Sequence, residues 1–249
     1  MEGLKEALEY VVGLNTPHYT EDEMGRAYSD KPMYMVQKSA TAETIKLTTL
    51  GSLVVYLLNK GDEHKGELYV HVEQPDRVRL LDTVCRRDDY KRNNFVTVTA
   101  DIPVFPFGQF MAAEEFIIKV KSMFQDMPVA EGQYGKTDIL LYAGNVQNGS
   151  VKTCIDDGVT QHAEIKTGIL NTENLIAPSI VVLKPFRTFL EVEQPESEFL
   201  FRMKQNRDGE VMCALFEADG FLWKNRAKAS VAEYLAEMLK ANENIIILC

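Results

Sequence analysis

The chain has 249 residues, and 27 lysines and arginines stand against 37 aspartates and glutamates, so its formal net charge is −10. With 45% hydrophobic and 26% charged residues it can bury a sizeable core, which excludes a chain that is disordered along most of its length. The acidic balance argues against sequence-independent binding to nucleic acid and against binding to an anionic membrane, because both need a basic surface.

Several features indicate a cytoplasmic protein. The first six residues hold two acids and lack the basic start and apolar core of a secretory signal. The longest apolar runs, at residues 53–58 and 245–249, fall short of the roughly 20 residues that cross a bilayer. The four cysteines are scattered and form no C-x-x-C pair, so we expect reduced thiols rather than a zinc site or a redox dithiol.

Two helices joined by an arm are predicted at the start of the chain. In residues 2–12 the apolar side chains recur on one helical face. Residues 13–40 mix glycine, proline, asparagine and charge without a period, so we expect an irregular arm. From residue 41 to residue 59 apolar residues recur at spacings of three and four, and Lys60 and Gly61 supply a basic last turn and a glycine stop.

Much of the remaining chain is predicted to form strands. Strict alternation of apolar and polar residues is clearest at residues 67–74. Further strands are predicted at residues 77–84, 95–100, 139–146, 151–155, 159–167, 180–184, 186–194, 198–205, 210–217 and 245–248. The dipeptides Asn148-Gly149 and Asp157-Gly158 tolerate the positive φ of tight turns, which predicts an antiparallel meander around them.

Two more helices complete the pattern. Residues 110–124 return to helical spacing. Ser230 and Glu233 form a capping box that would open a helix running to residue 240. We therefore predict an α+β fold, with antiparallel sheets built from hairpins and three or four packed helices.

A repeated tetrapeptide bears on the domain organisation. Val-Glu-Gln-Pro occurs at residues 72–75 and again at residues 192–195, each time at the end of a predicted strand. Chance recurrence is one explanation, and two halves of related fold are the other. The expected organisation is a helix and irregular arm over residues 1–40, a first α+β half over residues 41–125 and a second over residues 138–249, with a single domain as the alternative.

One segment is similar to a phosphate-binding loop. Residues 130–137 read Ala-Glu-Gly-Gln-Tyr-Gly-Lys-Thr. Such a loop needs a buried strand before it and a helix after it, whereas residues 125–128 make a poor buried strand and residues 138–142 read as a strand. Glu131 would also direct a carboxylate at the phosphates. We expect an ordinary loop.

No local pattern predicts a reactive site. The four histidines form no H-x-x-x-H or H-E-x-x-H pair, and no serine lies in a G-x-S-x-G turn. We therefore predict no catalytic residue, no metal site and no cofactor. Whether the protein is an enzyme stays open, with binding favoured over catalysis.

Cations and aromatic residues gather in the last third of this acidic chain. The candidate binding residues are Lys184, Arg187, Phe189, Arg202, Trp223, Lys224 and Arg226. A guanidinium beside an aromatic ring suits a site that holds a nucleotide-like or phosphorylated ligand by charge and stacking, and it equally suits an anchor in a protein interface. The alternative is solvated cations beside core aromatic residues.

The last third of the chain also shows a family resemblance, which lies in three stretches, Pro185–Phe189, Val192–Pro195 and Ala214–Gly220. These stretches resemble an uncharacterised protein family carried by tailed phages and prophages of Gram-positive bacteria. The resemblance implies a protein made during infection that works in the host cytoplasm, on phage DNA metabolism or on host defence. It supplies no catalytic motif.

We therefore expect a phage-type accessory protein that acts by binding a nucleotide-like small molecule or a host or phage protein, as a homo-oligomer. Sequestration of a phosphorylated host immune signal is one concrete version. The alternatives are an accessory protein for phage replication or recombination that binds only other proteins, and a metal-dependent phosphodiesterase or nuclease built from dispersed carboxylates and a histidine.

Overall fold

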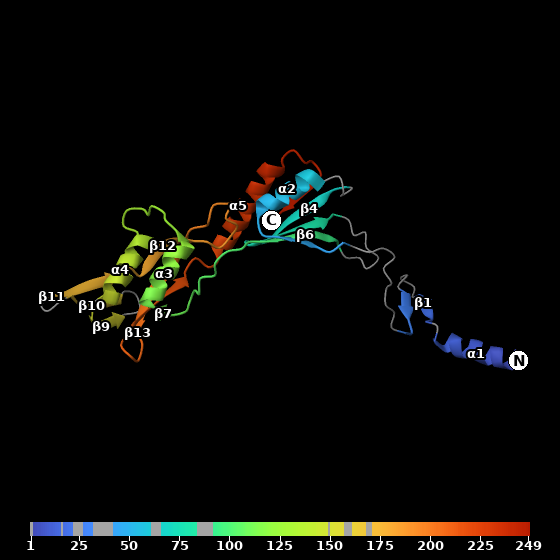
Figure 1. Cartoon of the computed structure of the whole chain (residues 1–249), viewed down its shortest axis with the longest axis horizontal. Helices are drawn as coiled ribbons and strands as arrows, with labels where there is room; N and C mark the ends of the chain where they lie inside the picture. Colours follow the sequence, from blue (N-terminus) through green and yellow to red (C-terminus); the bar gives the residue numbers. More distant parts are fainter. Residues whose placement is uncertain are drawn as a thin grey trace. The chain divides into compact units, whose positions relative to one another are not determined.

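The computed structural model of the chain describes residues 2–15, 17–21, 27–31, 42–60, 66–83, 92–148, 150–156, 161–167 and 171–249. The chain separates into two compact units. One holds residues 1–42 and 87–91, and the other holds residues 43–86 and 92–249. The second unit contains both large sheets (Figure 1).

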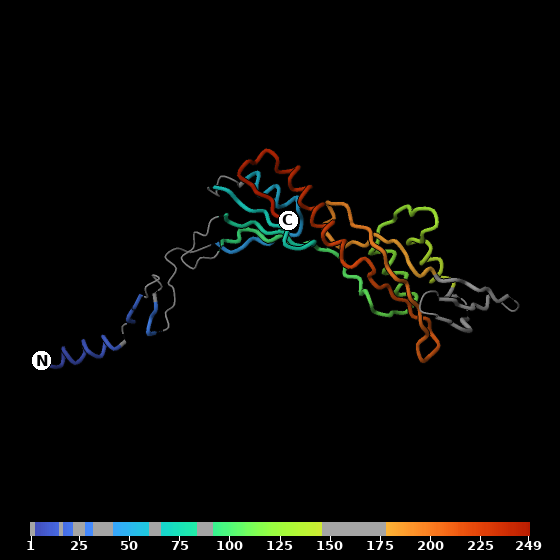
Figure 2. Tube along the Cα trace, turned by 180° about the vertical axis from the view of Figure 1, so that it is seen from behind, coloured from blue at the N-terminus to red at the C-terminus, as the bar shows by residue number. Residues whose placement is uncertain are grey.

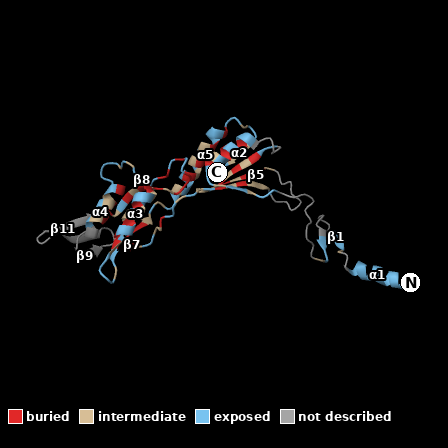
Figure 3. Cartoon of the chain, viewed as in Figure 1, coloured by how far each residue is buried: buried red, intermediate tan, exposed pale blue. Residues whose placement is uncertain are grey.

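The N-terminal unit contains a helix and a pair of short strands. α1 (Glu2–Asn15) confirms the predicted N-terminal helix, and its apolar side chains are exposed (Figure 3). β1 (Tyr19–Glu21) pairs antiparallel with β2 (Ala27–Ser29) inside the stretch that was predicted to be irregular. Residues 22–26 and 32–40 of that stretch lie outside the described residues.

The first large sheet has the strand order β15-β4-β5-β6-β3 over the described residues. Its strands are β3 (Ile45–Leu47), β4 (Leu68–Gln74), β5 (Arg77–Asp82), β6 (Asn94–Thr99) and β15 (Ile245–Leu248). The three central strands are antiparallel, whereas the edge strands β3 and β15 pair parallel with β6 and β4. The helices α2 (Leu50–Lys60) and α5 (Leu222–Leu239) cover one face of this sheet (Figure 1).

The covered face is buried because the strands alternate as the sequence predicts. Along β4 and β5 every second side chain is apolar and buried, while the residues between them are partly exposed. The same core takes in apolar side chains from both helices, including Leu53, Leu57, Val231 and Leu235. The other face of the sheet has no helix on it among the described elements.

The second large sheet is antiparallel throughout, with the order β7-β14-β13-β12-β8 over the part of the chain that is described. Its strands are β7 (Met111–Ala112), β8 (Phe124–Gln125), β12 (Ile180–Pro185), β13 (Ser197–Gln205) and β14 (Val211–Glu217). Its core is rich in phenylalanine and lies under α3 (Ala113–Met123) and α4 (Lys136–Asn148). A small antiparallel sheet adds β9 (Ser150–Asp156), β10 (Gln161–Thr167) and β11 (Asn171–Ala177).

These elements establish an α+β fold with mostly antiparallel sheets, as predicted. The sheets do not follow the expected halves 41–125 and 138–249. α5 and β15, from the end of the chain, complete the first sheet, and β7, α3 and β8, from before residue 126, belong to the second. In Figure 2 the red C-terminal segment accordingly lies beside the cyan segment that contains α2.

Two predicted strands are wrong. Residues 139–146 were expected to be a strand and instead form α4, which buries Ile139, Tyr142 and Ala143 at helical spacing. The Asp138 carboxylate accepts a hydrogen bond from the Gly135 amide at 2.7 Å and so caps the start of this helix. Residues 186–194, also predicted to be a strand, form a loop.

Two predicted helix starts are wrong as well. The predicted helix from residue 41 begins only at Leu50, because residues 45–47 form the edge strand β3. α5 begins at Leu222 rather than Ser230, and the Ser230 hydroxyl bonds the Arg226 carbonyl inside the helix instead of capping it. Gly149 and the turn dipeptide at residues 157–158 lie outside the described residues.

Candidate functional site

The loop that carries Arg187 is closed by one glutamine. The buried Gln194 side chain accepts hydrogen bonds from the backbone amides of Arg187 at 2.9 Å and of Thr188 at 3.2 Å. Its amide group donates to the carbonyl of Phe189 at 2.9 Å and, at 3.4 Å, to those of Thr188 and Val192. A side chain therefore satisfies backbone groups that a strand would pair in a ladder, which explains why residues 186–194 are not a strand.

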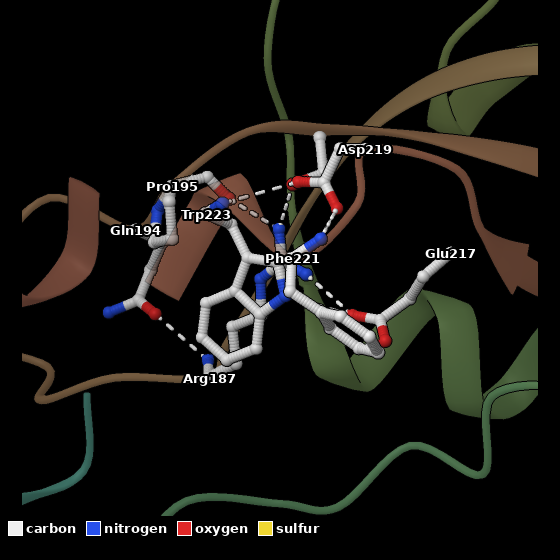
Figure 4. Close-up of polar contacts among 8 residues, drawn as sticks. Arg187, Gln194, Pro195, Glu217, Asp219, Phe221 and Trp223 are labelled. Atoms are coloured by element: carbon white, nitrogen blue, oxygen red, sulfur yellow. Dashed lines mark hydrogen bonds and ion pairs between the residues drawn. The ribbon is translucent and has the colours of Figure 1, made fainter. Parts of the chain in front are cut away.

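The Arg187 guanidinium is held on several sides (Figure 4). Nη1 donates to Glu217 Oε1 at 3.2 Å, and Nη2 donates to the Pro195 carbonyl at 3.3 Å and to the Ser197 hydroxyl. The guanidinium carbon of Arg187 lies 4.1 Å from the ring centroid of Trp223. The same Glu217 oxygen accepts the indole N–H of Trp223 at 3.0 Å, so carboxylate, indole and guanidinium form one cluster.

A second carboxylate fixes the chain around this cluster. Asp219 Oδ2 accepts the Ser197 hydroxyl at 2.6 Å, and Asp219 Oδ1 accepts the Phe221 amide at 3.1 Å, just before α5 begins. Arg187 is only 8% exposed, and this burial lowers its pKa to about 10, although Glu217 and Asp219 act in the opposite direction. A buried cation with these internal partners supports the fold and presents little of its charge to solvent.

The other predicted binding residues do not converge on Arg187. Phe189 is buried in the core of the first sheet. Arg202 lies on the face of β13 opposite Ser197 and Phe199, because successive side chains of a strand alternate. Lys184 donates to Glu193 at 2.7 Å and lowers the pKa of that carboxylate.

Trp223 and Arg187 are thus in contact. Two other predicted cations, Lys224 and Arg226, lie nearby on α5. The Lys224 ammonium lies 4.4 Å from the ring centroid of Phe221. Arg226 lines a cavity of about 490 Å³ beside the cluster. Carboxylates of Glu196, Glu198 and Asp219 line the same cavity, so it favours a cationic group over a phosphate.

The segment at residues 130–137, which is similar to a phosphate-binding loop, forms part of that cavity's wall. A helix follows it where a strand was predicted. The helix α4 does follow it, so the predicted strand was the wrong reason for setting aside a phosphate-binding loop. Its lysine nevertheless turns away from the loop. Lys136 is buried, and its ammonium donates to the Phe124 carbonyl at 2.6 Å and lies 2.9 Å from Asp126.

A second candidate site lies on the uncovered face of the first sheet. We call it the cationic hollow: a depression of about 530 Å³ lined by Lys46, Arg77, Arg79, Asn94, Thr97 and Thr99 together with parts of Thr44, Leu47 and Thr48. Among the described residues that line it, three are cations and none is a carboxylate. Glu73 of β4 contacts both arginines: its Oε2 lies 3.1 Å from Arg79 Nε and 3.9 Å from Arg77 Nη1.

Strand pairing fixes this arrangement. Arg79 of β5 lies opposite Thr97 of β6, which lies opposite Lys46 of β3. Two strand spacings, about 10 Å in all, separate the backbones of Arg79 and Lys46. Sequence reasoning missed the hollow, although alternation in Arg77-Val78-Arg79-Leu80 already indicates that both arginines share the face opposite a buried valine and leucine.

Over the described residues, no group of three or more histidine, cysteine, aspartate or glutamate side chains is placed to hold a metal ion. None of the described helices is both long and apolar enough to span a bilayer. The chain matches no family model, and no curated protein or solved structure matches it.

Proposed function

We propose that the protein acts by binding a phosphorylated ligand in the cationic hollow. The observation that carries this proposal is the charge of the hollow, where Lys46, Arg77 and Arg79 meet without a lining carboxylate in a chain whose net charge is −10. A local positive surface in an acidic protein attracts an anion selectively, while the surrounding charge disfavours long polyanions.

The chemistry around the cations also suits a phosphate. Arginine presents N–H groups in a planar fork that matches phosphate oxygens, and lysine adds a point charge from the other side. The hydroxyls of Thr97 and Thr99 line the same floor. Asn94 Nδ2 donates to Thr97 Oγ1 at 2.9 Å, so the hydroxyl hydrogen of Thr97 is left to donate to a ligand. Glu73 contributes one negative charge against the three cations of the hollow, so the net local charge stays positive, and its carboxylate orients Arg79.

The proposed biological role keeps the phage-type setting that the C-terminal stretches imply. A phage accessory protein that sequesters a phosphorylated host signal needs such a site and needs no reactive residue. The cationic hollow supports that role better than the Arg187 cluster does, because Arg187 is buried and bound to its own chain.

The test is titration calorimetry with AMP and ribose 5-phosphate as probes, on the full chain and two variants. Lys46→Ala removes an exposed cation of the hollow, and Lys121→Ala removes an exposed lysine of α3 as a matched control. We expect Lys46→Ala to weaken binding about tenfold, the usual scale of one charge-assisted hydrogen bond, and Lys121→Ala to leave it unchanged. Absence of heat with both probes, or equal weakening in both variants, would show that the hollow is not a phosphate site.

A further inference from the structure

The uncovered face that holds the cationic hollow also carries an apolar part. Tyr69 of β4 and Leu81 of β5 lie directly opposite each other on this face, and Ile246 of β15 lies opposite Tyr69 on the other side. Ile246 and Leu248 are 37% and 38% exposed, while their neighbours Ile245 and Ile247 pack against the core. An apolar group made of Tyr69, Leu81, Ile246 and Leu248 therefore lies beside the cationic hollow on this face, with His71 between Leu248 and Arg79.

Strand register places these two parts side by side. His71 lies directly opposite Arg79, and Tyr69 lies opposite Leu81, two residues further along β5. Tyr69 and Arg79 are therefore diagonal neighbours on the same face, about 7–8 Å apart. A ligand that holds a phosphate at Arg79 reaches Tyr69 if it carries a ring about one sugar away.

Tyr69 is also prepared for a planar partner. The Arg92 guanidinium lies 5.3 Å from the Tyr69 ring centroid, and Arg92 is held there by hydrogen bonds to the carbonyls of Asp82, at 2.9 Å, and Thr83. Tyrosine rings and arginine guanidinium planes are the side chains on which nucleic-acid bases stack, because both present a flat, polarisable surface.

We infer that the ligand of the cationic hollow is a free nucleotide, with its phosphate at Lys46, Arg77 and Arg79 and its base against Tyr69 and Arg92. This inference rests on the proposed function and adds the ring to it. A sugar phosphate would leave the apolar part of the face empty, and a long strand of nucleic acid would meet the negative charge of the rest of the chain.

The experiment measures binding of AMP, ribose 5-phosphate, adenosine and a ten-residue oligoadenylate to the full chain, to Lys46→Ala and to two further variants. Tyr69→Thr removes the ring and keeps a residue that favours strands. Tyr134→Thr removes a half-exposed ring from the loop before α4 and is the control. We expect AMP to bind at least tenfold more tightly than ribose 5-phosphate, and Tyr69→Thr to abolish that difference without changing the affinity for ribose 5-phosphate. Tyr134→Thr should leave both affinities as they are.

The possible outcomes distinguish nucleotide binding from phosphate binding alone. Equal affinity for AMP and ribose 5-phosphate, both weakened about tenfold in Lys46→Ala, would overturn the nucleotide and leave phosphate binding intact. Loss of all binding in the unmodified chain would overturn the proposed function itself. Oligoadenylate that binds more tightly than AMP would overturn the free nucleotide as the form of the ligand, and weaker binding of oligoadenylate would support it.

Discussion

Replacement of Gln194 by alanine tests how the Arg187 loop is held. The substitution removes the one side chain that accepts the amides of Arg187 and Thr188 and donates to three carbonyls. The loop is buried at this point, and Gln194 itself is 1% exposed, so water does not readily replace the lost partners.

The expected loss follows from the geometry of those bonds. Two of them are 2.9 Å long, and the other three, at 3.2–3.4 Å, are weaker. A buried donor or acceptor left without a partner costs about 1–3 kcal/mol, so we expect the free energy of unfolding to fall by about 3–5 kcal/mol. That is a large share of the roughly 5–15 kcal/mol that stabilises a typical domain.

The assay is urea denaturation followed by circular dichroism, and the chain provides its own control. Gln74 occupies the same place in the other Val-Glu-Gln-Pro copy, at the end of β4, but it is exposed. Gln74→Ala should therefore change the stability by less than about 0.5 kcal/mol. If both variants unfold at the urea concentration of the unmodified protein, the reasoning that Gln194 closes the loop is wrong.

Three further predictions concern the second sheet. Burial raises the pKa of the Cys213 thiol to about 12, above its ordinary 9.0. The folded protein therefore keeps this proton at a pH at which the unfolded chain has lost it, and the free energy of unfolding falls as the pH rises from 9 toward 12. Cys213→Ala should lessen this alkaline loss by about 1 kcal/mol per pH unit between pH 9 and pH 10.5, because the unfolded thiol is half ionised at pH 9. Urea midpoints that shift equally in both proteins between these pH values would contradict it. Lys136→Met should lower the free energy of unfolding by about 2 kcal/mol, because the carbonyls of Lys121 and Phe124 lose a donor. Asp126→Asn should lower it by less than about 0.5 kcal/mol, because Asp126 is 91% exposed. Urea denaturation curves that coincide for the two variants would contradict this difference. Phe201→Ala should cost about 3–5 kcal/mol and Phe221→Ala, at an exposed position, less than 1 kcal/mol in thermal unfolding, and a reversed order would show that the core is elsewhere.

Much of the fold follows from local pattern. Strands such as β4 and β5 are predictable because one face of each is buried and the other is not, so alternation survives in the sequence. α4 was missed because its apolar residues Ile139, Leu140, Leu141 and Tyr142 are consecutive, and a short apolar run does not distinguish a strand from a helix. The Asp138 cap was the available signal for a helix.

The site was harder to predict because it depends on which strands become neighbours. Of the seven predicted binding residues, Arg187 and Trp223 lie in contact. The burial of Arg187, which makes this a structural cluster, depends on partners from distant parts of the chain such as Ser197 and Glu217. Lys46 joins Arg79 only because β3 pairs parallel with β6, and no local pattern encodes that pairing.

The order of the chain through its two sheets has a consequence for synthesis on the ribosome. β3 to β6 emerge early, yet α5 and β15, which cover and extend their sheet, emerge only after the whole second sheet. Until then α2 alone covers the apolar side of the early strands and the part that α5 will cover stays open to water or to a chaperone, whereas the second sheet has all its own strands before α5 is made. The later sheet therefore has the chance to fold first, and the proposed ligand site matures last, when the C-terminal strand docks beside β4.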